Sequence, residues 1–153
     1  MNTTLIQVEI VIPSQTRYLD FIGGIGERLV KELDDFSGDL EELAYQLNLV
    51  LTEATANVIK HAASTADKNS VKVVISIEAN ELTIKVYDRG VGFVLEDVPL
   101  PDLDHPKEHG MGLFFIRSIM DAVTYTTHSE ANVLEMKKKL KPLTVTDSPD
   151  GNG

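Results

Sequence analysis

The chain has 153 residues, with 24 Asp or Glu and 14 Lys or Arg, so its formal net charge is 14 − 24 = −10. This length favours a single domain, and a composition of 42% hydrophobic and 25% charged residues excludes a disordered or collagen-like chain. The acidic balance argues against direct nucleic-acid binding, which rewards clustered Lys and Arg, and the absence of cysteine excludes disulfides, zinc–thiolate sites and cysteine nucleophiles.

Hydrophobic periodicity predicts a strand, two helices, two strands, a helix and two strands. Apolar residues alternate in the strands and recur three and four residues apart in the helices. Because the strands come in hairpins and the helices in separate groups, we expect an α+β fold: a two-layer sandwich with helices packed on one face of a mostly antiparallel, mixed sheet. In chain order, the predicted elements are a strand over 5–12, helices over 14–33 and 40–63, strands over 71–78 and 82–88, a helix over 112–122, and strands over 123–128 and 133–140.

Several residues are typical of helix ends or interruptions. Ser14 and Asp39 are predicted N-caps of the first two helices, because their side-chain oxygens can accept hydrogen bonds from free N–H groups of a first turn. Gly23, Gly24 and Gly26 interrupt the first helix. They do not sit at a strand-to-helix turn, as a dinucleotide-binding motif would, so we interpret them as close helix packing or a local irregularity.

Two stretches lack hydrophobic periodicity. Residues 89–109 contain three prolines, and a connection of about 20 residues is typical of a lid or a disordered segment. The polar residues 142–153 predict a flexible tail, so we expect one domain over residues 1–141 followed by that tail. The run Lys137, Lys138 and Lys139 falls on a predicted strand, where we interpret it as protection of a sheet edge.

Glu53 and Asn57 are the first candidate site residues. They lie four residues apart on the second predicted helix, so they share one face beside its apolar stripe. A carboxylate and a carboxamide placed in this way can orient a water or hydroxyl and complete the oxygen shell of Mg²⁺. A solvated helix face is the alternative interpretation.

Asp88 is the second candidate, because it occupies the next core-facing position after Ile84 and Val86 on its strand. An ionised carboxylate there needs hydrogen-bond donors, and the following Gly90 and Gly92 allow close approach of a ligand to the backbone. This combination suits a flat ligand that offers an amino group, as adenine does. An ordinary turn after a strand-ending Asp is the alternative.

The third candidate is Gly110-Met111-Gly112, which opens the third predicted helix. A glycine-rich helix start exposes unpaired N–H groups at the positive end of the helix dipole, where phosphate binds. Glycine is also an acceptable N-cap, so this pattern alone has a simple structural alternative. The four histidines lie far apart without paired ligand spacing, and we therefore expect no metal cluster among them.

Taken together, three segments resemble the motifs of the GHKL (Bergerat-fold) ATPases. Residues 53–62 resemble their N-box, residues 88–93 their D-x-G-x-G box and residues 110–113 their second glycine box. More narrowly, Lys60-His61-Ala62 and the run over 112–123 are similar to bacterial anti-sigma factors that are also serine kinases. The resemblance extends over residues 6–140, nearly the whole chain.

The resemblance implies a Bergerat ATP-binding fold with ATP and Mg²⁺ as cofactors. Glu53 would be the catalytic base, Asn57 would coordinate Mg²⁺, and Asp88 would accept a hydrogen bond from the adenine amino group. The remaining implied contacts are Gly90 and Gly92 in the base pocket, Gly110, Met111 and Gly112 at the phosphates, and residues 89–109 as the ATP lid.

The same resemblance implies a partner-switching system. The substrate would be a serine of an anti-anti-sigma (STAS-domain) protein, and the family allows a sigma factor as second partner and a homodimer. Two alternatives stay open: a nucleotide-dependent binding module without kinase activity, and the less favoured catalytic domain of a histidine kinase. Without a recognisable signal peptide or membrane span, we expect a cytoplasmic protein that does not contact the membrane.

Overall fold

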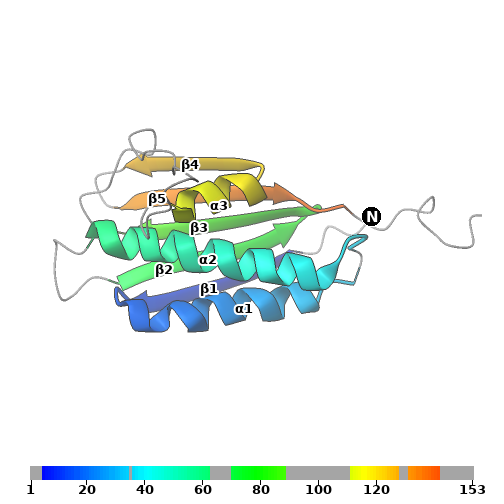
Figure 1. Ribbon diagram of the computed structural model, residues 1–153, viewed down its shortest axis with the longest axis horizontal. Helices are drawn as coiled ribbons and strands as arrows, with labels where there is room; N and C mark the ends of the chain where they lie inside the picture. Colours follow the sequence, from blue (N-terminus) through cyan, green and yellow to red (C-terminus); the bar gives the residue numbers. More distant parts are fainter. Residues whose placement is uncertain (1–4, 35, 63–69, 89–110, 128–130, 142–153) are drawn as a thin grey trace, which may run out of the picture.

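The computed structural model describes residues 5–34, 36–62, 70–88, 111–127 and 131–141. Within these ranges, five strands form one sheet in the order β1-β2-β3-β5-β4, and three α-helices cover one of its faces (Figure 1). The strands are β1 (Ile6–Pro13), β2 (Ser70–Glu78), β3 (Glu81–Asp88), β4 (Ala122–Thr127) and β5 (Asn132–Lys139), and the helices are α1 (Leu19–Lys31), α2 (Leu40–Ala62) and α3 (Met111–Ile119).

This arrangement confirms the expected α+β two-layer sandwich. All four pairs of neighbouring strands that the structure describes are antiparallel, so the expectation of a mixed sheet is wrong for the described strands. The core lies between the sheet and the helices, as the alternating and helical patterns require. Its largest fully buried side chains include Leu47, Leu51 and Val58 on α2 and Ile75, Ile84, Leu134 and Met136 on the sheet. None of the described helices is long and apolar enough to cross a membrane.

A two-residue turn joins β2 to β3, as the predicted hairpin requires. Ala79 and Asn80 both have positive φ angles, of 51° and 61°, which is the signature of a type I′ turn. The Asn80 carbonyl oxygen also accepts a hydrogen bond of 2.7 Å from the Leu140 N–H. The turn is therefore tied to the chain just after β5.

The two predicted helix caps have different outcomes. Asp39 Oδ1 accepts hydrogen bonds from the N–H groups of Glu41 at 2.9 Å and Glu42 at 3.3 Å, which confirms it as the cap of α2. Ser14 does not cap α1, so that prediction is wrong. A 3₁₀ turn over Thr16–Tyr18 precedes α1 and places Ser14 too far upstream to reach its first turn.

The glycines of α1 allow it to pack closely on α2. A Cβ atom on Gly23 would lie 2.5 Å from Asn48 Oδ1, and one on Gly26 would overlap Leu51 Cδ1. These two positions confirm the interpretation of close helix packing. A Cβ on Gly24 would meet no atom within 4 Å, so close packing does not explain a glycine at this position.

The lysine run on β5 does not protect a sheet edge, which corrects the prediction. β5 lies between β3 and β4, and the edges of the described sheet are β1 and β4. Lys137 Nζ lies 3.9 Å from Glu81 Oε1 on β3. Lys138 Nζ donates a hydrogen bond of 2.9 Å to the carbonyl oxygen of Ile119, so it caps the C-terminal end of α3.

Candidate functional site

Helix α2 connects the three candidate segments. It packs against α1 on one side and α3 on the other, and it also contacts β3. Figure 1 shows that the C-terminal end of α2 and the C-terminal end of β3 lie at the same end of the domain. The fold therefore brings the helix with Glu53 and Asn57, the strand end with Asp88 and the start of α3 into one region.

Glu53 packs directly on the first turn of α3. A Cβ atom on Gly112 would overlap Glu53 Oε2 and would lie 3.1 Å from Glu53 Cδ and 3.3 Å from Glu53 Cβ. The carboxylate therefore fills the space that any other residue at position 112 would need. The structure thus brings together two predicted site residues that are 59 positions apart in the sequence (112 − 53).

Asn57 lies one helical turn after Glu53, and both side chains are half-buried. They flank Ala54 and Val58, which are 0% and 1% exposed and face the core. This is the position beside the apolar stripe that the sequence predicted. A half-buried carboxylate and carboxamide on one helix face can hold a cation or orient a hydroxyl while remaining accessible to a ligand.

Asp88 is the last residue of β3 and is 5% exposed. It continues the buried face of that strand, as the alternation predicted. Its Oδ1 accepts a hydrogen bond of 3.2 Å from Nδ2 of Asn132, the first residue of β5, which is 4% exposed. A buried carboxylate next to a buried carboxamide is a polar pair inside an apolar layer, and it is held by the register of two adjacent strands.

Asn132 is the residue that sequence reasoning missed. It belongs to none of the three motifs, and only the strand pairing places it opposite Asp88. The sequence carries no local signal for it, because periodicity does not report which strand lies beside a residue.

The other predicted contacts cannot be placed. Gly90, Gly92, Gly110 and the proposed lid over 89–109 lie outside the described residues. Met111 begins α3, but its side chain is not described. The described part of the site therefore consists of Glu53, Asn57, Asp88, Asn132 and the backbone of Gly112.

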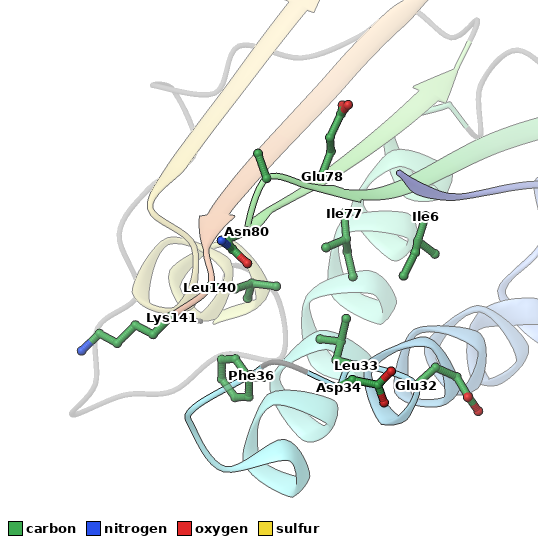
Figure 2. A pocket seen from close by; sticks show the side chains of 11 residues that line it. Ile6, Glu32, Leu33, Asp34, Phe36, Ile77, Glu78, Asn80, Leu140 and Lys141 are labelled. Atoms are coloured by element: carbon green, nitrogen blue, oxygen red, sulfur yellow. The ribbon is translucent and has the colours of Figure 1, made fainter. Parts of the chain in front are cut away.

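Among the described residues, a cavity lies near each end of the sheet. One, of about 230 Å³, borders Asp88 and is lined by Val11, Ser70, Lys72, Tyr87 and Ala131. The other, of about 210 Å³, lies near the β2–β3 turn. Figure 2 shows Ile6 and Ile77 pointing from the sheet into this second cavity, towards Leu33. None of the described candidate residues lines the second cavity.

Comparison with known proteins identifies the family. Residues 27–138 match the model of the histidine kinase-like ATPase domain. A serine-protein kinase RsbW from Bacillus thuringiensis (strain Al Hakam) is 26% identical over 159 aligned residues, which cover 95% of this chain and 91% of the relative. A second RsbW, from Bacillus velezensis, is 24% identical and covers 90% of this chain and 88% of the relative.

A solved structure shares the fold. The histidine kinase domain of the Erythrobacter litoralis EL346 blue-light activated histidine kinase superposes with a TM-score of 0.52 at 17% identity, over 84% of this chain. The chain spans 62% of the length of that structure. These findings confirm the resemblance to the GHKL ATPases and their anti-sigma factor serine kinases. The chain belongs to the histidine kinase-like ATPase domain family.

Proposed function

We propose that this chain binds Mg-ATP and transfers a phosphoryl group to a serine of an anti-anti-sigma (STAS-domain) protein. The observation that carries the proposal is the position of Glu53 against the first turn of α3, with Asn57 one helical turn further along α2. Phosphoryl transfer to a hydroxyl needs a positioned base next to a phosphate-binding element. The names of the relatives, serine-protein kinases, point in the same direction.

The described residues fit Mg-ATP at three points. Asn57 offers a carboxamide oxygen of the kind that Mg²⁺ accepts, the first turn of α3 offers backbone N–H groups to phosphate, and Asp88 offers a buried carboxylate to an adenine amino group. When bound, Mg-ATP supplies the phosphoryl group and the metal charge that offsets the phosphates. Gly90, Gly92, Gly110 and Met111 complete the nucleotide pocket in this proposal.

The protein's own residues then have distinct roles. The Glu53 carboxylate accepts the proton of the attacking seryl hydroxyl and aligns its oxygen with the phosphoryl group. The N–H groups at the start of α3 face the negative charge of the phosphoryl group during transfer. Asp88 accepts a hydrogen bond from the adenine amino group and so fixes the position of the nucleotide relative to Glu53.

The proposal extends to the partners. In the cytoplasm, the protein acts as an anti-sigma factor that holds a sigma factor and exchanges it for the STAS protein according to nucleotide state. A homodimer is compatible with this role. The chain's formal charge of −10 favours protein partners over direct contact with nucleic acid.

A labelling experiment tests the proposed function. The protein is incubated with Mg²⁺, ATP labelled at the γ-phosphate and each STAS-domain protein of its own organism. We expect one STAS protein to be labelled on serine, and we expect Glu53→Gln to slow labelling by about 10²- to 10⁴-fold, because it removes the base. Glu41→Gln, at the exposed start of α2, is the matched control and leaves the rate unchanged.

Two results would contradict parts of the proposal. Labelling by Glu53→Gln at the wild-type rate would remove Glu53 from its role as base. A wild-type protein that binds a STAS partner but labels none would be a partner-binding module instead of a kinase.

A further inference from the structure

Gly112 and Glu53 share a space that holds only one of their side chains. A Cβ atom on Gly112 would overlap Glu53 Oε2 and would crowd Glu53 Cδ at 3.1 Å and Cβ at 3.3 Å. By contrast, a Cβ on Gly24, also in a helix, would meet nothing within 4 Å. The missing side chain at position 112 therefore has a specific use in this chain: it leaves room for the Glu53 carboxylate.

We propose that Gly112 is a positioning residue for Glu53. This role goes beyond a contact between Gly112 and phosphate. The bare backbone of the first turn of α3 forms a seat that holds the carboxylate in place for proton transfer. The inference rests on the proposed kinase function, because it concerns the residue proposed there as the base. It assigns to position 112 a role in the rate of transfer that is separate from nucleotide affinity.

The chemistry of the seat favours a carboxylate. The start of a helix carries partial positive charge and free N–H groups, so an acidic side chain is stabilised there. α2 and α3 pack against each other, so the seat and Glu53 are held on two rigid elements. A misplacement of a catalytic group by about 1 Å can slow a reaction by about 10²-fold.

A methyl group at position 112 should move the base without unfolding the domain. The overlapping atom, Glu53 Oε2, is the end of a flexible side chain and can rotate away. Alanine is also a better helix former than glycine. We therefore expect Gly112→Ala to fold, to bind ATP and to transfer phosphate about 10²-fold more slowly than the wild type.

The kinetic experiment compares four proteins with the full chain intact: wild type, Gly112→Ala, Glu53→Asp and the double variant. Gly24→Ala is the control for a glycine-to-alanine change in a helix, and it leaves the rate unchanged. Aspartate is one methylene shorter and withdraws the carboxylate from Gly112. We therefore expect Gly112→Ala to slow transfer in the wild-type background and to have no further effect in the Glu53→Asp background.

Equilibrium binding of ATP separates positioning from phosphate contact. We expect the dissociation constant of Gly112→Ala for Mg-ATP to stay within about threefold of the wild-type value, a free-energy change of about 0.6 kcal/mol. A loss of affinity as large as the loss of rate would overturn the inference, because the methyl group would then act on the nucleotide and not on Glu53.

A second readout needs no nucleotide. Thermal unfolding is measured for wild type, Gly112→Ala, Glu53→Ala and the double variant. We expect Gly112→Ala to lower the Tm when Glu53 is present and to leave it unchanged or raise it in the Glu53→Ala background, since Oε2 and Cδ are then gone and only the Cβ of residue 53 stays close, at 3.3 Å. Equal Tm shifts in both backgrounds would overturn the inference whatever the kinase assay shows. A wild-type protein that labels no STAS partner would refute the proposed function whatever the unfolding cycle shows.

Discussion

Asn132 donates a hydrogen bond of 3.2 Å from Nδ2 to Oδ1 of Asp88, directly across the pairing of β5 with β3. The two side chains are 4% and 5% exposed. Because a buried carboxylate needs hydrogen-bond donors, this bond fixes the orientation of Asp88 at the end of β3, where we propose that adenine binds. The proposed nucleotide site therefore extends to β5, outside the three sequence motifs.

Replacing Asn132 should affect both stability and nucleotide binding. We expect Asn132→Leu to lower the free energy of unfolding by about 1–3 kcal/mol, because the buried Asp88 loses a donor. We also expect weaker binding of Mg-ATP, because the carboxylate is no longer held in place. Urea unfolding and titration calorimetry measure the two effects. Thr127→Val, on the exposed side of β4 opposite Asn132, is the control, and an equal loss there would contradict the assignment.

The packing of α1 on α2 predicts opposite results for two neighbouring glycines. Gly26→Ala would overlap Leu51 Cδ1 and crowd Leu47 Cγ at 3.2 Å, so we expect a loss of about 1–3 kcal/mol of stability. Gly24→Ala meets open space and should increase stability by about 0.5–1 kcal/mol. Chemical denaturation of both variants measures the difference. Similar changes at both positions would refute the close contact at Gly26.

The cap of α2 gives a third prediction. Asp39→Ala removes the acceptor of two backbone hydrogen bonds, so the free energy of unfolding should fall by about 1 kcal/mol. Ser14→Ala is the matched test of the position that sequence favoured for α1, and it should change stability by less than about 0.5 kcal/mol. Thermal and urea unfolding of the two variants check this. A larger loss of stability in Ser14→Ala would indicate that Ser14 caps α1 after all.

Lys138 links β5 to the C-terminal end of α3. Lys138→Met keeps the apolar stem of the side chain but removes the hydrogen bond to the Ile119 carbonyl. We expect a loss of about 0.5–1.5 kcal/mol of stability, visible in urea unfolding. Lys139→Met, at an exposed neighbouring position, is the control with little effect. A loss of the same size in both variants would indicate a general charge effect and contradict the cap.

Local sequence determined most of the elements and the positions of three candidate site residues. Alternation placed Asp88 on the buried face of β3, because side chains in a strand alternate strictly between two faces. Helical spacing placed Glu53 and Asn57 on one face of α2, beside the core. Asp39 as a cap also followed from residue chemistry alone, since short-range hydrogen bonding decides it.

Tertiary structure decided what touches these residues. The insertion of β5 between β3 and β4 moved Lys137 and Lys138 away from a sheet edge and placed Asn132 against Asp88, 44 residues away. The packing of α3 on α2 placed Gly112 against Glu53. Neither contact has a local signal, because periodicity reports which face a residue occupies and not which distant element covers it. The sequence by itself therefore determined the chemical groups of the candidate site, whereas their neighbours depended on strand order and helix packing.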